Sequence, residues 1–295
     1  MTLRIAHLSD IHFGAENRPA VEASVAAVAG FAPTVTMVTG DLTLNGLPQE
    51  FRAARQWLDL LPAARIVTPG NHDTPYWNLI LRALTPFNRY RRYIGEPNEA
   101  AFDAPGLAAR TLNSARGGQP RIDWSKGALA IDDLKAIDWG SAEGRALRVF
   151  GCHHPLIDLP SAPVTGGVRR GDQAAAYLAA TGVELVLTGH VHVPFALPLQ
   201  EAGHVGYAIG AGTLSLRTRG VPASFSTIVA ERDSFQVQVH AWDGARFVPD
   251  RSWTLPRGRR ASERLEGLPI QDDATVAPTV PPTAMTPSGD GKKEV

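Results

Sequence analysis

Two short motifs place chemically active side chains two residues apart. His190 and His192 follow the apolar run 183–187, and Asp10 and His12 follow the apolar run 3–8. In an extended segment, side chains at positions i and i+2 point the same way. Each pair therefore presents two donor groups on one side of a strand end, which suits a metal site better than a hydrophobic core.

Three further polar residues follow apolar runs elsewhere in the chain and complete a candidate ligand set. The set consists of Asp10, His12, Asp41, Asn71, His153, His190 and His192. Carboxylates, an amide oxygen and imidazoles together suit Mn, Fe or Zn, whereas magnesium alone prefers oxygen ligands. Seven ligands are too many for one ion but suit two ions that share a bridging carboxylate.

Two metal ions in one site favour chemistry at phosphorus. Ions roughly 3.5–4 Å apart can hold both the attacking and the leaving oxygen of an in-line displacement. They also lower the pKa of a bridging water, which makes hydroxide available at neutral pH. The ligand set therefore predicts a hydrolase of phosphate esters.

The first part of the chain alternates strands and helices. Strands are predicted at residues 3–8, 34–39 and 65–68, and helices at 19–31 and 48–61, the second with apolar residues at i, i+3 and i+4 spacing. This alternation predicts an α/β fold with a parallel sheet flanked by helices. Ligands in such sheets bind outside the carboxyl ends of the strands, where the first three motifs would lie along one edge.

The rest of the chain is less regular and then changes character. Helices are predicted on either side of Pro86 within 76–93 and at 172–181, and strands at 110–113, 146–150 and 183–187. After His192, strand-like runs at 207–209, 226–230 and 235–239 follow one another without helices, which predicts a second, antiparallel sheet. We expect residues 1–255 to form the catalytic domain and residues 256–295, rich in Pro, Thr, Arg and Asp, to be a disordered tail.

The ordered motifs resemble those of the calcineurin-like metallophosphoesterases. In family order, the matching motifs are Asp10-Ile11-His12, Gly40-Asp41, Gly70-Asn71-His72-Asp73, His153 before Pro155, and Gly189-His190-Val191-His192. The resemblance implies an α/β/β/α sandwich of two mixed sheets flanked by helices. The Gly-Asn-His-Asp form is most similar to that of the bacterial class III cyclic-nucleotide and glycerophosphodiester phosphodiesterases, which favours a diester substrate.

The resemblance also implies a role for each motif residue. One metal ion would be held by Asp10, His12, Asp41 and His192. The other would be held by Asp41, Asn71, His153 and His190, with Asp41 as the bridge. A metal-bridging hydroxide would attack in line, His72 would bind a phosphate oxygen or protonate the leaving group, and Asp73 would orient His72.

Other functions remain open on the sequence alone. Within the same family, a phosphomonoesterase or a nucleotide-sugar pyrophosphatase is the first alternative. A nuclease is disfavoured because 29 basic and 29 acidic residues balance, which removes the electrostatic argument for nucleic acid or anionic membrane. A non-catalytic scaffold that kept the fold is the alternative from another class, although such a protein would be expected to have lost ligands.

The single cysteine and the absence of long apolar runs bear on location. Cys152 alone cannot form an intrachain disulfide, which fits a reducing compartment. No signal-peptide pattern and no run of about 18 apolar residues occurs, so we expect a cytoplasmic protein without membrane association. A small phosphate-ester substrate is the expected partner, and a homo-oligomer stays open.

Six residues near the motifs are weaker candidates. They are Tyr76, Trp77, Cys152, His154, Arg169 and Arg170. Strand alternation predicts that Cys152 and His154 point away from the ligand between them. The two arginines could reach a substrate phosphate or form a solvated loop, and the two aromatic residues could wall the pocket or simply pack.

Overall fold

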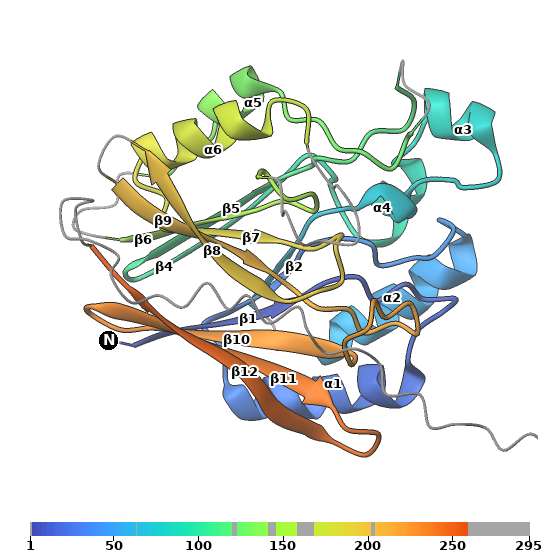
Figure 1. The fold of residues 1–295 in the computed structure, drawn as a ribbon. Helices are drawn as coiled ribbons and strands as arrows, with labels where there is room; N and C mark the ends of the chain where they lie inside the picture. Colours follow the sequence, from blue (N-terminus) through green and yellow to red (C-terminus); the bar gives the residue numbers. More distant parts are fainter. Residues whose placement is uncertain are drawn as a thin grey trace, which may run out of the picture. The chain divides into compact units, whose positions relative to one another are not determined.

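Two six-stranded mixed sheets lie face to face in this protein, with helices on their outer faces (Figure 1). The computed structural model describes residues 2–62, 64–119, 123–140, 146–157, 168–201 and 204–258, with side chains of 200–205 left aside. The α/β sandwich of two mixed sheets is therefore confirmed. The predicted tail lies almost entirely outside the described residues, and the last strand ends at Pro256.

The first sheet has the order β12-β11-β10-β1-β2-β3. Its strands are β1 (Leu3–Leu8), β2 (Val35–Val38), β3 (Arg65–Val67), β10 (Ser224–Ala230), β11 (Ser234–Trp242) and β12 (Phe247–Pro256). β1, β2 and β3 run parallel, as the alternating pattern predicts. β10 pairs antiparallel with β1 on its other side, with Leu3 opposite Ala230.

The second sheet has the order β4-β5-β6-β7-β9-β8. Its strands are β4 (Glu99–Ala104), β5 (Leu107–Leu112), β6 (Leu147–Gly151), β7 (Leu185–Thr188), β8 (Phe195–Glu201) and β9 (His204–Gly210). The prediction that the strands after His192 form a separate antiparallel sheet is wrong. β9 extends the second sheet in parallel with β7, while β10 and β11 return to the first sheet, because an open strand edge rather than sequence order decides the partner.

Three layers of apolar side chains hold the sandwich together. Ile5 and Met37 of the first sheet and Leu185 and Leu187 of the second belong to one buried cluster that includes both sheets. α1 (Arg18–Phe31) and α2 (Pro48–Leu60) cover the outer face of the first sheet, and α5 (Ile131–Lys135) and α6 (Gly171–Ala180) cover that of the second. Successive strand residues thus pack into apolar layers on opposite faces of each sheet. Polar side chains that could bind a ligand are therefore expected at the strand ends.

Local sequence explains how the connecting elements begin and end. α2 starts at Pro48, and the Glu50 carboxylate accepts the amide of Leu47 at 3.0 Å, which closes its first turn. Pro86 separates α3 (Leu79–Leu84) from α4 (Asn88–Tyr93), as predicted. A 3₁₀ turn, η1 (Asn71–Asp73), follows β3. Within the described residues, no helix is both long and apolar enough to cross a membrane.

Candidate metal centre

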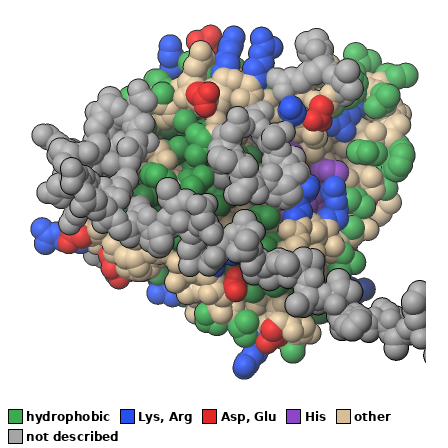
Figure 2. All heavy atoms as spheres, viewed as in Figure 1, with side chains coloured by type: hydrophobic (Ala, Val, Ile, Leu, Met, Phe, Trp, Pro, Cys, Tyr) green, Lys and Arg blue, Asp and Glu red, His purple; other side chains and the backbone are tan. Residues whose placement is uncertain are grey.

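All seven candidate ligands lie just beyond the carboxyl ends of parallel strands. Asp10 and His12 follow β1, Asp41 follows β2, and Asn71 lies in η1 after β3, so the first sheet supplies four. The second sheet supplies His153 after β6 and the His190–His192 pair after β7. Because the two sheets pack face to face, their strand ends bring these residues together, and Figure 2 shows histidine side chains bordered by basic and hydrophobic ones.

One donor set gathers Asp10, His12 and His192. Nε2 of His192 lies 3.0 Å from Oδ1 of Asp10 and 3.2 Å from Nε2 of His12. Both side chains of the first motif are fully buried. The three ligand atoms therefore face a common point of the size that one metal ion occupies.

Asp41 lies between this set and a second one. Its Oδ2 is 3.7 Å from Nε2 of His12 and 3.2 Å from Nε2 of His153. His153 in turn lies beside His190, with ring centroids 5.2 Å apart. The position of Asp41 between imidazoles from both sheets is the geometry that a shared ligand requires.

Backbone carbonyls fix the tautomers of three of the imidazoles. Nδ1 of His153 donates to Thr39 O at 2.7 Å and Nδ1 of His192 donates to Arg217 O at 2.7 Å. Nδ1 of His12 lies 3.3 Å from Thr43 O. In a neutral imidazole this leaves the lone pair on Nε2, the atom that points into the centre.

These contacts fit bound cations better than a protein-only network. With Nδ1 donating, Nε2 of His12 and Nε2 of His192 turn two lone pairs toward each other at 3.2 Å. Among the described residues, Asp10 Oδ1 and Asn71 Oδ1 are buried without hydrogen-bond partners. Unsatisfied buried polar atoms cost free energy, and a metal ion at the centre would satisfy all of them. The residues present therefore fit divalent metal ions.

Burial and charge set the protonation of the donors. Burial lowers the pKa of His12 to about 4 and that of His190 to about 3, so both imidazoles are neutral at pH 7. Burial also disfavours the charged form of His153, but the charges of Asp41 and Asp10 and the hydrogen bonds to Asp41 and Thr39 O together raise its pKa to about 9. A metal ion beside His153 must therefore displace a proton, which makes metal affinity dependent on pH.

Five of the seven candidates have a left-handed backbone. The φ angles are 56° at Asp10, 49° at His12, 50° at Asp41, 71° at His190 and 61° at His192. The expected extended alternation within the motifs is therefore wrong, because each strand ends before its motif. The chain turns there instead, and conformations of this kind, which cost about 1–3 kcal/mol each, concentrate at functional sites.

Two motif glycines are required by close packing. A Cβ on Gly70 would overlap the Asp41 carboxylate, and a Cβ on Gly189 would overlap Ser9 and lie 2.5 Å from Oδ2 of Asp10. The amide of His190 donates to that same Asp10 oxygen at 2.9 Å. The glycines thus let neighbouring loops contact the carboxylates directly.

The structure contradicts the expectation that Asp73 orients His72. Oδ2 of Asp73 accepts the amides of Leu42 at 3.2 Å and Gly70 at 2.9 Å, and Oδ1 accepts the amide of Thr43 at 2.9 Å. Nδ1 of His72 donates instead to a main-chain carbonyl, Leu44 O, at 2.6 Å. Consecutive residues of a tight turn diverge, so Asp73 points into the loops and joins the β2 and β3 motifs.

Replacing Asp73 by Ala should therefore destabilise the protein rather than alter His72. Three buried amides would lose their acceptor, and at about 1–3 kcal/mol for each unsatisfied group we expect a loss of at least about 3 kcal/mol in unfolding free energy. Urea unfolding of the metal-free protein measures it. Asp243→Ala is the matched control, because Asp243 also accepts two amides but at an exposed turn where water can replace it; equal losses in the two variants would contradict the assignment.

The imidazole of His72 lies at the edge of the candidate centre. Its ring is perpendicular to that of His12 at 4.8 Å and stacks on Tyr76 at 6.2 Å. Nη1 of Arg217 donates to its Nε2 at 3.1 Å. Trp77, next in the chain after Tyr76, is 76% exposed, so it packs little and stands at the surface beside the site.

Sequence reasoning missed Arg217 altogether. This residue lies in the loop after β9, a strand that runs parallel to β7, so the loop leaves the sheet at the same edge as the His190–His192 motif. The sequence does predict the strand at 207–209 that precedes this loop. It does not predict that this strand runs parallel to β7, and that direction brings Arg217 to the site.

Comparison with known proteins now places the chain in a family. The profile of the calcineurin-like phosphoesterases matches residues 3–194, which span all seven candidate ligands. The chain is a calcineurin-like phosphoesterase. The resemblance of the motifs is thereby confirmed, and this phosphoesterase is a metal-dependent enzyme that acts on phosphate esters.

Two curated relatives are phosphodiesterases by name. The chain is 28% identical over 254 residues to a probable cyclic nucleotide phosphodiesterase from Synechococcus sp., covering 81% of this chain and 92% of that one. It is 28% identical over 172 residues to the glycerophosphodiester phosphodiesterase GpdQ of Enterobacter lignolyticus, covering 54% of this chain and 59% of that one.

Solved structures share the fold at low identity. A purple acid phosphatase from yellow lupin matches with a TM-score of 0.61 at 11% identity, over 87% of this chain and 54% of that one. A dimetal phosphatase from Danio rerio matches with a TM-score of 0.57 at 13% identity, over 87% and 99% of the two chains.

The weaker candidates near His153 have structural environments in the phosphoesterase. Cys152 is fully buried, as expected. His154 is buried too, with Nδ1 bonded to Ser114 at 2.8 Å and Nε2 to Ser125 O at 2.7 Å. Its ring does not point away as predicted, since its centroid is 4.6 Å from that of His190, but both its nitrogens are already engaged. The two arginines of the following loop, Arg169 and Arg170, are exposed.

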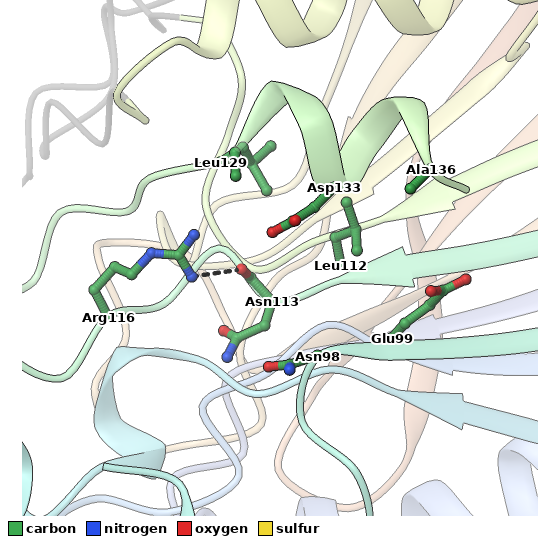
Figure 3. Close-up of a pocket in the computed structure, with 9 residues that line it drawn as sticks. Asn98, Glu99, Leu112, Asn113, Arg116, Leu129, Asp133 and Ala136 are labelled. Atoms are coloured by element: carbon green, nitrogen blue, oxygen red, sulfur yellow. Dashed lines mark hydrogen bonds between the residues drawn. The ribbon is translucent and has the colours of Figure 1, made fainter. Parts of the chain in front are cut away.

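A separate pocket of about 270 Å³ lies between the β5 end and α5 (Figure 3). Its lining includes Asn98, Asn113, Arg116 and Asp133, and the dashed line in Figure 3 joins Arg116 to the main chain of Asn113. None of the seven candidate ligands lines it. The candidate metal centre at the strand ends is therefore separate from this pocket.

Proposed function

We propose that this phosphoesterase is a phosphodiesterase that uses two metal ions of the Mn, Fe or Zn type. The observation that carries the proposal is the position of Asp41, whose Oδ2 lies near Nε2 of His12 and Nε2 of His153, while Asp10 Oδ1 and Asn71 Oδ1 are buried without hydrogen-bond partners among the described residues. One ion would be held by Asp10, His12, Asp41 and His192. The other would be held by Asp41, Asn71, His153 and His190.

Such ions would supply a water of lowered pKa and neutralise charge on the phosphoryl oxygens. The chain's own residues orient the imidazole ligands and contact the substrate. Carbonyls of residues 39, 43 and 217 keep the imidazole lone pairs on Nε2. His72 stands beside His12, where it would bind a phosphate oxygen or hold a proton for the leaving group.

A diester substrate is favoured by the relatives, both of which are named as phosphodiesterases. Family membership alone would also accommodate a phosphomonoesterase or a nucleotide-sugar pyrophosphatase. The substrate assay has to separate these, because their reactions share the same donor set.

The test is an activity panel after metal reconstitution. Metal-stripped protein would be reloaded with Mn, Fe or Zn and assayed on cyclic nucleotides, glycerophosphodiesters, nucleotide-sugars, and an aryl monoester and diester. We expect the diesters to be hydrolysed with the highest kcat/KM, and stripped protein to be inactive. A preference for the monoester would overturn the diester assignment. A failure to bind any of the metals would favour the alternative of a non-catalytic scaffold.

A further inference from the structure

The loop formed by residues 211–219 lies against the candidate metal centre. Oγ1 of Thr213 donates to Asp10 O at 2.6 Å and lies 2.7 Å from Oγ of Ser215. Oγ of Ser215 accepts the amide of Arg217 at 3.1 Å, and Arg217 O accepts Nδ1 of His192. The main chain of Arg217 is therefore fixed to the loops that carry two candidate ligands.

The guanidinium of Arg217 reaches His72 at the edge of this centre. Its Nη1 donates to Nε2 of His72, whose ring contacts that of His12. A guanidinium has five N–H donors, and a single neutral imidazole uses only one of them. Only the ring of His72 therefore separates Arg217 from the candidate ligand His12. The guanidinium keeps further N–H donors for a bound anion.

Arg219 adds a second cation to the same loop. Its Nε is buried and has no hydrogen-bond partner in the part of the chain that the structure describes. Burial and the nearby charge of Arg217 lower the pKa of Arg219, while Asp10 raises it. Arg219 lies two residues after Arg217 in the same loop, and its buried Nε is a donor that a bound anion would satisfy.

We propose that Arg217 and Arg219 form an anion subsite that binds the phosphoryl oxygens of the substrate on the His72 side of the metal centre. The inference deepens the proposed function and rests on it. Two guanidiniums match a tetrahedral phosphate better than one does, because each fork can bind two oxygens. Two positive charges also favour a dianion over a monoanion, so the monoester left by diester cleavage should bind more tightly than the diester itself.

Phosphate binding tests the subsite independently of turnover. Inorganic phosphate would be titrated calorimetrically into Mn-loaded wild type, Arg217→Ala, Arg217→Lys and Arg219→Ala. A hydrogen bond to a charged group contributes about 1.5–3 kcal/mol, so each Ala variant should weaken phosphate binding about 10- to 100-fold, and the Lys variant should recover part of the loss. Arg246→Ala is the matched control, because its exposed side chain pairs only with its neighbour Asp243 among the described residues.

Metal content and kinetics complete the test. Metal content should stay at the wild-type value in Arg217→Ala, because the carbonyl that holds His192 belongs to the main chain. KM for the aryl diester should rise more than kcat falls. If the wild type were inactive on every substrate, the proposed function would be refuted. The phosphate titration would still test the anion subsite, because it does not depend on turnover. Unchanged phosphate affinity in both Ala variants, or loss of metal from them, would overturn the subsite.

Discussion

Asp41→Asn should abolish phosphoesterase activity and leave at most one metal ion per chain. Both carboxylate oxygens of Asp41 are in use: Oδ1 accepts the amide of His72 at 2.8 Å, and Oδ2 faces the imidazoles of His12 and His153. Asn keeps the shape and one acceptor but removes the charge that two cations would share. It also tolerates the left-handed backbone at this position better than Ala does, so it isolates the electrostatic effect.

Mutating a residue that only hydrogen-bonds a metal ligand lowers activity roughly 10- to 100-fold. The loss in kcat/KM for Asp41→Asn should be larger than that. Steady-state assays and elemental analysis of the purified variant measure the two effects. Asp59→Asn is the matched control, because Asp59 is a half-exposed carboxylate that pairs with surface arginines. If Asp41→Asn kept two ions and full activity, Asp41 could not be the shared ligand.

His72→Ala should keep the metal content of the wild type and lose rate. A general acid contributes about 10²–10⁴-fold, and its loss weighs most on substrates with poor leaving groups. In the structure, however, Nε2 of His72 accepts a hydrogen bond from Arg217, and burial lowers the pKa of the imidazole. His72 could therefore act on the leaving group only after Arg217 moves to the substrate.

Aryl diesters with leaving groups of graded pKa separate the two possible roles of His72. Proton donation predicts a loss that grows as the leaving group becomes more basic. Positioning of Arg217 alone predicts a uniform loss and a higher KM. His240→Ala provides the matched control, because this imidazole stacks on Phe225 and its Nε2 lies 2.9 Å from Oγ1 of Thr227, neither of which is a candidate ligand; a rate for His72→Ala equal to that of this control would exclude both roles.

The candidate ligands were predictable because each motif directly follows an apolar strand. Strand direction and polar strand ends are local properties of the sequence, and a parallel sheet converts them into one edge. The same reasoning placed Asn71 beyond the end of the third strand, where the structure has η1. It needed no knowledge of which strands pair.

Contacts between distant segments were not predictable in this way. The pairing of β10 with β1, and the arrival of Arg217 beside His72, depend on the free edge that each strand finds in three dimensions. The role given to Asp73 failed for a related reason. Sequence showed that its carboxylate adjoins His72, but the turn geometry sends it to amides of a different motif.

The central place of β1 in the first sheet has a consequence for synthesis of the chain. β1 leaves the ribosome long before β10, which is one of its two neighbours, so its pairing on that side waits for residues 224–230. A nascent chain that ends at residue 194 would already carry all seven candidate ligands yet expose an unpaired strand edge in the middle of its future sheet. Such edges promote aggregation, and non-local pairing slows folding. Truncation after the last ligand motif is therefore the wrong route to a minimal phosphoesterase, since the strands beyond it complete the sheet that holds the first three motifs.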